Sequence, residues 1–166
     1  KISKNDKVLC AKFRKGHFEG VLAVINQFLK KIQSKRIYLG EKDFQQIYLI
    51  KKFIKNKFKI KVCTCKTVRG KGFLPLSSRN NLLKKNEIKK ASLISQNIKK
   101  FYFSIKGNFN NKHKIFQVRN NLNKMGVVIE YFELRNKNTL SKKFNKRNFK
   151  LFIAFYVNKV RLIDNI

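Results

Sequence analysis

The chain has 166 residues, of which 43% are hydrophobic, so it can build the core of one domain or two small ones and is not disordered by composition. Its formal net charge of +33 predicts attraction to polyanions such as nucleic acid or an anionic membrane surface. Lysine outnumbers arginine 33 to 8 and is spread along the chain, whereas a nucleic-acid reader concentrates charge on one face and uses arginine for bidentate contacts. We therefore expect nonspecific stickiness and no specific nucleic-acid partner.

The sequence contains no run of about 18 uninterrupted apolar residues, so we expect no membrane span and a cytoplasmic location. Cys10, Cys63 and Cys65 are odd in number and lack the second pair of a zinc site, which indicates reduced core thiols and no metal site. The sequence begins at a lysine and not at a methionine, and we expect it to be a fragment of a longer protein.

The first half of the chain has the pattern of a βαβ unit. Apolar residues at helical spacing predict an amphipathic helix over 18–32. A strand at 36–39, a second helix ending at Ile54 and a strand at 60–64 follow with short links. Strands joined in this way are parallel and connected by a right-handed crossover.

The segment 66–81 is the longest irregular stretch and has the composition of a working loop, with two glycines and the only proline. A third helix is predicted from an N-cap at Asn86 to about residue 100, and the aromatic run at 101–105 fits no type clearly. We expect two domains, 1–80 and 81–166.

The last part of the chain predicts one helix and three strands. The helix covers 115–124 and is C-capped by Gly126. The strands are expected at 127–134, 149–157 and 160–163, the last two joined by a tight turn. This half is therefore an α+β domain with an antiparallel sheet.

Polar residues follow the first strand at the edge where an open α/β sheet binds ligands. Gly40 lets a ligand approach the backbone, and Glu41, Lys42 and Asp43 lie at the lip of the crevice. Asp43 could orient the lysine or hold Mg²⁺ on a nucleotide, or form only a surface ion pair. Gln46 could bind a hydroxyl or belong to a solvated helix face, and one of Gln45 and Gln46 can face inward.

Ser77, Ser78 and Arg79 offer two hydroxyls and a guanidinium in succession, which suits a polyphosphate. The alternative is an ordinary polar turn that caps the next helix. Lys42, placed across the crevice, favours phosphate. His17 is more often structural than a catalytic base in such a turn, and His113 lies in a lysine-rich link. The signatures of hydrolases, P-loop proteins, zincins and dinucleotide-binding proteins do not occur.

Four segments, in order and nearly spanning the chain, resemble the pantothenate synthetases, also called pantoate–beta-alanine ligases. Residues 13–24 read FRKGHFEGVLAV, similar to the family's FRPGHFxGVxTV, and residues 38–46 read YLGEKDFQQ, similar to its FGEKDxQQ. Residues 76–80 read LSSRN, similar to its (M/L)SSRN, and residues 160–166 read VRLIDNI, similar to its TRLIDNI ending.

The resemblance implies a nucleotidylyltransferase with a Rossmann-like parallel-sheet domain, of which this chain is the second part, followed by a small C-terminal domain. It implies ATP-dependent joining of pantoate to beta-alanine through a pantoyl-adenylate, with Mg²⁺, in a cytoplasmic homodimer. The positions that resemble ATP-binding residues are Gly40, Glu41, Lys42, Asp43, Val68, Leu76, Ser77, Ser78 and Arg79. Lys42, Ser77, Ser78 and Arg79 are expected to act in catalysis, and Gln46 and Arg14 at the substrate.

The sequence departs from the family pattern at several places. Gly72 and Phe73 stand where the family has an acidic residue and a glycine, Leu82 replaces a tyrosine, and Lys15 replaces a proline. The family's HxGH motif lies outside these 166 residues, so we expect the isolated chain to be inactive or nearly so. The alternatives are a basic nucleic-acid-binding or decayed non-catalytic fragment and a different adenylate-forming transferase.

Overall fold

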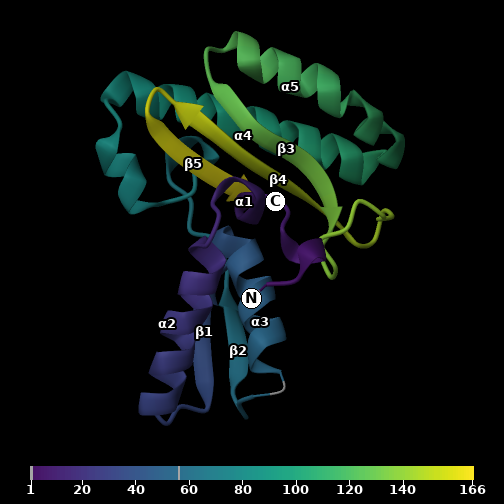
Figure 1. Ribbon diagram of the computed structural model, residues 1–166. Coiled ribbons are helices and arrows are strands. Elements are labelled where there is room, and N and C mark those ends of the chain that lie inside the picture. Colours follow the sequence, from purple (N-terminus) through teal and green to yellow (C-terminus); the bar gives the residue numbers. More distant parts are fainter. Residues whose placement is uncertain (1, 56) are drawn as a thin grey trace. The chain divides into compact units, whose positions relative to one another are not determined.

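The structure is a computed structural model that describes residues 2–55 and 57–166 (Figure 1). The chain divides into two compact units, and the boundary lies between Thr67 and Val68. The expected boundary at residue 80 falls inside the second unit. Within that unit, Arg69 of residues 68–80 forms an ion pair with Asp164 near the end of the chain.

The first unit begins with two short helices and one long one. They are η1 (Lys4–Asp6), α1 (Cys10–Phe13) and α2 (His17–Lys31). The predicted helix at 18–32 is confirmed as α2, which follows Gly16 at φ +77°. Phe18 is the one residue of α2 that is fully buried, so most of the apolar stripe of this helix is only partly covered.

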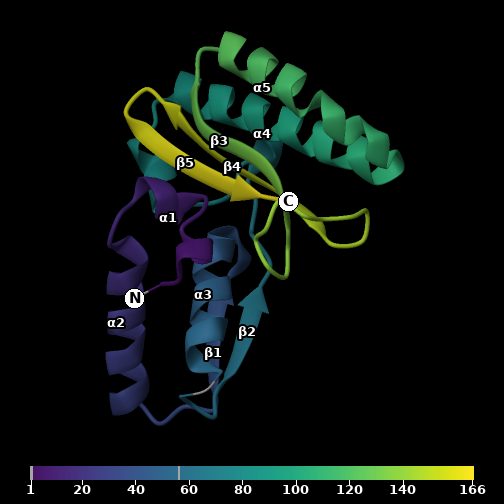
Figure 2. The same cartoon turned by 45° about the vertical axis from the view of Figure 1, so that its right-hand side comes forward.

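A parallel strand pair forms the sheet of the first unit. β1 (Arg36–Gly40) leads through η2 (Glu41–Asp43) into α3 (Phe44–Ile54), and β2 (Lys61–Cys65) follows. The two strands pair in parallel from Arg36 opposite Lys61 to Gly40 opposite Cys65, which confirms the predicted βαβ unit. Both α2 and α3 run along these strands (Figure 2).

Three antiparallel strands form the sheet of the second unit. They are β3 (Val128–Asn136), β4 (Phe149–Val157) and β5 (Val160–Asn165), in the order β3-β4-β5. The predicted antiparallel sheet is confirmed. Asn158 has φ +52° in the two-residue turn between β4 and β5, a conformation that asparagine tolerates better than most residues.

Two helices, α4 (Lys85–Gly107) and α5 (Ile115–Lys124), cover one face of this sheet (Figures 1 and 2). The short segment η5 (Phe109–Lys114) connects them. The domain core lies between the sheet and the helices, and its members include Ile94, Ile98, Leu122, Ile153 and Phe155. The predicted helix at 115–124 is confirmed as α5.

Helix α4 differs from its prediction at both ends. Its N-cap is Lys84, whose backbone N–H donates to the Glu87 carboxylate at 2.7 Å, so the prediction of Asn86 as N-cap is wrong. The helix continues through the aromatic run to Gly107 because Phe101 and Ile105 extend its buried stripe. Before α4, the loop contains the short segments η3 (Lys71–Phe73) and η4 (Ser78–Leu82).

The cysteine thiols lie in different environments. Cys10 is buried, Cys63 is half-buried and Cys65 is exposed. The prediction of core thiols therefore holds for Cys10 and is wrong for Cys65, because β2 is an edge strand of a two-stranded sheet. Within residues 2–55 and 57–166, no group of three or more His, Cys, Asp or Glu side chains is arranged to hold a metal ion. None of the helices described is both long and apolar enough to cross a membrane.

Candidate nucleotide-binding site

The first set of predicted site residues lies where β1 passes into α3. Gly40 ends the strand in an extended conformation, and a Cβ built on it meets no heavy atom within 4 Å. The backbone is therefore sterically open at Gly40, and the expected approach of a ligand there stays a prediction. Glu41, Lys42 and Asp43 form the single turn η2 immediately before α3.

Lys42 and Asp43 form a loose ion pair, with Nζ and Oδ2 3.8 Å apart. The Lys42 side chain is 20% exposed and that of Asp43 is 45% exposed. The carboxylate is thus available to a ligand and near enough to restrict the ammonium group, although an exposed pair of this length contributes little to stability. Gln46 lies half-buried in the first turn of α3.

Gln45, next to Gln46, is the glutamine that faces inward. Only 5% of it is exposed, and its Nε2 donates to the carbonyls of Asp6 at 3.1 Å and Val8 at 2.7 Å. Its Oε1 accepts from the Ala11 backbone N–H at 3.3 Å. Gln45 therefore ties the N-terminal segment to α3, and the expected substrate role of Gln46 stays a prediction. The sequence contained both residues but could not show which one points inward.

A buried carboxylate makes a second tie between the same two segments. The Asp6 side chain accepts from Lys52 Nζ at 2.8 Å and from Ser3 Oγ at 2.6 Å. Burial raises the pKa of Asp6, but the hydrogen bonds and the charge of Lys52 outweigh it and bring that pKa below its ordinary value. The bond to Asp6 raises the pKa of Lys52. Burial, followed by the charge of Asp6, raises the pKa of Tyr48 on the same helix.

Arg14 lies at the C-terminal end of α1, in the turn that leads to α2. Its N–H donates to the Cys10 carbonyl at 2.9 Å, and its own carbonyl accepts from the His17 N–H at 3.2 Å. The side chain is half-buried. Since Gln45 and Asp6 hold the segment that precedes α1, they also fix the place of Arg14 within the unit.

The second set lies on the loop that opens the second unit. Val68 and Leu76 are 68% and 54% exposed, and the Leu76 N–H donates to the Val68 carbonyl at 3.0 Å. Gly70 and Leu74 form the next rung at 2.9 Å, so the loop is a small hairpin. It places two exposed apolar side chains side by side, which is suitable for one face of a flat ring such as adenine.

Ser77, Ser78 and Arg79 follow directly. Ser77 is the N-cap of η4, and its Oγ accepts from the Arg79 N–H at 3.2 Å. Ser77 therefore caps a turn, and its expected role at a phosphate stays a prediction. Ser78 is exposed and Arg79 is half-buried, so a hydroxyl and a guanidinium remain next to the capped turn. Asn80 Nδ2 donates to the Pro75 carbonyl at 3.0 Å and closes the loop behind them.

Each set of site residues is thus assembled within its own unit. The first contains Gly40, Glu41, Lys42, Asp43 and Gln46, with Arg14 in the same unit. The second contains Val68, Leu76, Ser77, Ser78 and Arg79. The expected approach of Lys42 to the Ser77–Arg79 turn stays a prediction.

A family model described as pantoate-beta-alanine ligase matches residues 1–166. The chain belongs to the pantoate–beta-alanine ligase family. A pantothenate synthetase of Francisella tularensis subsp. mediasiatica (strain FSC147) is 37% identical over 159 residues, which are 95% of this chain and 53% of that protein. The chain spans about half the length of the curated relatives it matches.

Solved structures of the family share this fold. The crystal structure of the pantoate–beta-alanine ligase from Francisella tularensis, complexed with beta-gamma ATP and beta-alanine, matches all of this chain and 56% of its own, with a TM-score of 0.81 and 34% identity. A pantothenate synthetase from Thermus thermophilus matches with a TM-score of 0.83 over 61% of its length at 23% identity, which shows the fold alone. The predicted fold class is therefore confirmed.

One departure from the pantoate–beta-alanine ligase pattern has a clear structural consequence. Phe73 stands where the family motif has glycine, and its φ is +69°, a region that L residues rarely adopt. The ring lies under the Arg69 guanidinium at 4.0 Å and the Lys99 ammonium at 4.5 Å. These two contacts hold a phenylalanine in a conformation that otherwise favours glycine.

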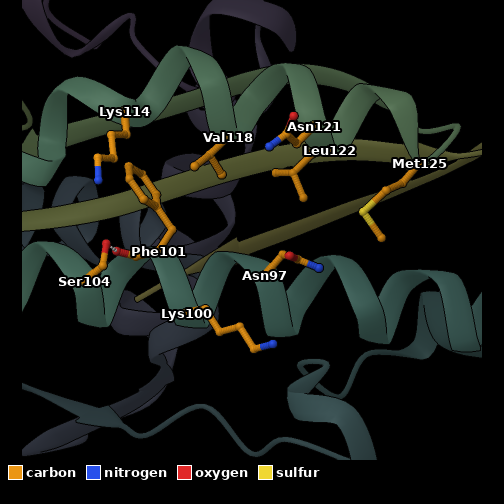
Figure 3. Close-up of a pocket in the computed structure, with 9 residues that line it drawn as sticks. All are labelled: Asn97, Lys100, Phe101, Ser104, Lys114, Val118, Asn121, Leu122 and Met125. Carbon is orange, nitrogen blue, oxygen red and sulfur yellow. Dashed lines mark hydrogen bonds between the residues drawn. The ribbon is translucent and has the colours of Figure 1, made fainter.

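A groove of about 300 Å³ between α4 and α5 is separate from both sets (Figure 3). Phe101, Val118, Leu122 and Met125 supply its apolar lining, and Lys100 and Lys114 are among its polar residues. None of the predicted site residues lines it.

Proposed function

We propose that the protein catalyses the ATP-dependent condensation of pantoate with beta-alanine, through a pantoyl-adenylate, to give pantothenate, AMP and diphosphate. The observation that carries the proposal is the match of the whole chain to the ligase family, with every residue of the GEKD and SSRN motifs retained. The related Francisella ligase, whose structure is a complex with beta-gamma ATP and beta-alanine, supports the same substrates.

The first half-reaction is attack of a pantoate carboxylate oxygen on the α-phosphorus of ATP, with diphosphate as leaving group. Both reactants are anionic, so the site must offset their charge. We assign this task to Lys42 from the first unit and Arg79 from the second. Ser77 and Ser78 supply hydrogen bonds to phosphate oxygens, and the backbone at Gly40 gives the nucleotide room to approach.

The nucleotide and substrate contacts follow the same division. The exposed pair Val68 and Leu76 offers an apolar surface for the adenine ring. Gln46 has a carboxamide that both donates to and accepts from a hydroxyl, as recognition of pantoate requires. Arg14 provides a further cation for the substrate carboxylate. The second half-reaction, attack of the beta-alanine amine on the acyl carbon with release of AMP, then depends mainly on positioning.

Mg²⁺ is proposed as a companion of ATP. Magnesium binds through one or two carboxylates together with phosphates and water, and the exposed carboxylate of Asp43 fits such a role. The ion would offset charge on the phosphates. We also propose, from the family resemblance, that the protein works as a homodimer in the cytoplasm.

The test is a coupled assay of diphosphate release by the complete protein, with ATP, pantoate and beta-alanine each omitted in turn. We expect turnover only when ATP and pantoate are both present, and pantothenate only when beta-alanine is added. Arg79→Ala should lower kcat/KM by about 100-fold or more, the usual effect of removing one charge-stabilising group. Arg147→Ala, which removes an exposed arginine, is the matched control.

Two results would contradict the proposal. One is ATP turnover that does not depend on pantoate, and the other is turnover with a different carboxylate in its place. The second result would identify a different adenylate-forming enzyme of the same fold.

A further inference from the structure

Arg69 lies inside the loop hairpin and is bound on both arms of its guanidinium. Its Nη1 donates to Asp164 Oδ2 and its Nη2 to Asp164 Oδ1, each at 2.8 Å. Nη1 also donates to the Phe73 carbonyl at 2.9 Å, and Nη2 to the Asn165 carbonyl at 3.2 Å. The Arg69 side chain is 15% exposed and that of Asp164 only 1%.

The partners of Arg69 come from the two ends of the second unit. Asp164 and Asn165 lie at the end of β5, and Phe73 lies at the tip of the loop hairpin. Asp164 also accepts from the Asn165 N–H at 2.7 Å, so its carboxylate is held in one orientation. Burial raises the pKa of Asp164, and the bonds from Arg69 offset part of that shift.

Arg69 also stands at the centre of the hairpin that presents the second set of site residues. It pairs with Pro75 as an isolated antiparallel bridge, between the rung of Val68 with Leu76 and the rung of Gly70 with Leu74. A guanidinium fixed to β5 at this point anchors both arms of the loop. The exposed side chains of Val68 and Leu76 lie one residue away from the anchor on each arm.

We propose that Arg69, fixed by Asp164, is a positioning residue for nucleotide binding: it holds loop 68–80 in the shape that presents Val68, Leu76 and the Ser77–Arg79 turn. The inference rests on the proposed function, because it assigns the loop to ATP. Both Nη groups of Arg69 are engaged within the protein, and we do not place this residue on the nucleotide. Its effect on ATP passes through the loop.

The alternative is that the pair only stabilises the unit. A lysine at position 69 keeps the charge but has a single point of contact in place of the planar fork, so it cannot hold Asp164 through two parallel bonds and stack on Phe73. Arg69→Lys therefore removes the geometry and keeps the charge. Asp164→Asn keeps the shape of the partner and removes its charge, and it serves where Arg69→Lys folds poorly.

Arg161→Lys is the matched control. Arg161 pairs with Glu130 in the same sheet, and their side chains are 12% and 10% exposed, close to the burial of the Arg69 pair. Arg161 donates to Glu130 through both Nε and Nη2, so the lysine breaks a similar fork. Glu130 and Arg161 lie outside loop 68–80. A general loss of stability should therefore appear in both Arg69→Lys and Arg161→Lys, whereas a change in the conformation of the loop should appear only in Arg69→Lys.

The experiment uses the complete protein and two measurements. Hydrogen exchange without nucleotide reads the order of the amides of residues 70–80, and steady-state kinetics read the KM for ATP and for pantoate. We expect Arg69→Lys to speed exchange in the loop and to raise the KM for ATP about tenfold. A tenfold change corresponds to the free energy of about one hydrogen bond to a charged group. The KM for pantoate should change by less than about twofold, because Gln46 and Arg14 are unaltered.

The outcomes separate this inference from the proposed function. If Arg69→Lys and Arg161→Lys alter loop exchange and the KM for ATP equally, the pair is merely stabilising and the inference is wrong. If the unaltered protein shows no pantoate-dependent turnover, the proposed function fails. The exchange measurement needs no substrate and tests the positioning role by itself. If hydrogen exchange in the loop is no faster in Arg69→Lys or Asp164→Asn than in the unaltered protein, the positioning role is wrong.

Discussion

Gly72 is the residue at which the loop comes closest to helix α4. A Cβ built on it would lie 2.6 Å from Ser92 Cβ, 3.0 Å from Ser92 Oγ and 3.2 Å from Gln96 Nε2. Its φ is +76°, and that of the next residue, Phe73, is +69°. Two successive residues in this region make a tight reversal that brings the loop backbone onto the helix. Glycine at position 72 is therefore required by both space and conformation.

Gly72→Ala should destabilise the second unit by about 2 to 4 kcal/mol, the sum of the left-handed conformation and the overpacking against Ser92. Gly107→Ala is the control, since a Cβ at this last residue of α4 meets no heavy atom within 4 Å. It should be neutral or slightly stabilising. Urea denaturation followed by circular dichroism measures both. Equal midpoints for the two variants would show that the loop does not rest on α4 as described.

The residues of the site differed in how far the sequence could place them. Gly40, Lys42 and Asp43 were predictable because local order alone puts them between a strand end and a helix start. The inward orientation of Gln45 was not, because its partners lie 34 to 39 positions away in the chain. The partner of Arg69 was likewise hidden, since Asp164 is 95 positions away. Contacts of this range depend on how the whole unit folds.

The N-terminal segment, from Ser3 to Ala11, is an element held in place by side chains. It contains the short helix η1 and the first two residues of α1, and it has no strand partner among the described elements. Gln45 and Lys52 hold it from one side of α3, seven positions apart and so on the same face of that helix. The order of this segment therefore depends on the charge state of Asp6.

The tie through Asp6 predicts a loss of stability in acid. The folded-state pKa of Asp6 is lowered, so its contribution is present above the ordinary aspartate pKa of about 3.9 and is lost as the pH falls through the lowered value. At neutral pH, Asp6→Asn should cost about 1 kcal/mol, a modest amount because Lys52 is half exposed. The variant should also flatten the dependence of stability on pH below about pH 4.

Urea midpoints at pH 7 and pH 3 measure this effect in the two proteins. Asp43→Asn serves as the control, because the Asp43 carboxylate is 45% exposed and lies 3.8 Å from Lys42, so the substitution should leave both midpoints unchanged. If Asp6→Asn keeps the full acid sensitivity of the unaltered protein, another carboxylate is responsible.

The long helix α4 shows what local patterns can and cannot predict. Its apolar positions up to Ile98 have clear helical spacing, so the helix itself was predictable. The run Phe101-Tyr102-Phe103 consists of aromatic residues, which also favour strands. For this reason the sequence did not predict that the helix continues beyond residue 100. Packing decides the outcome, because Phe101 is 5% exposed beside Phe132 of β3 whereas Phe103 is 54% exposed. The strand β3 that packs against Phe101 lies later in the chain, so local pattern could not reveal this contact.

At the scale of the molecule, the two units differ in how completely they bury their apolar residues. The second has a continuous core between a three-stranded sheet and two helices. The first has a two-stranded sheet, and Val24, Phe28 and Ile32 of the α2 region are more than half exposed. The sequence predicted both sheets and their strand directions because connection lengths determine them. The ion pair between Arg69 and Asp164 of β5, by contrast, could not be predicted from local pattern.

The net charge of +33 is a property of the whole molecule, and the proposed site includes only three of its basic residues, Arg14, Lys42 and Arg79. The 41 basic residues occur in every long helix and in all five strands, so no single element concentrates them. Attraction to a polyanion should therefore be general and unspecific. Each phosphate neutralised contributes about 0.9 to the slope of log affinity against log salt.

We expect the protein to bind unrelated DNA duplexes with equal affinity at about 50 mM salt, and to lose about 1000-fold or more of that affinity by about 200 mM. Fluorescence anisotropy with two duplexes of different sequence and one heparin sample measures it. Heparin should behave as DNA does, because only charge is recognised. A preference for one duplex that persists at the higher salt would contradict this account, because counterion release cannot distinguish base sequences. It would make specific nucleic-acid binding a function beside the ligase reaction.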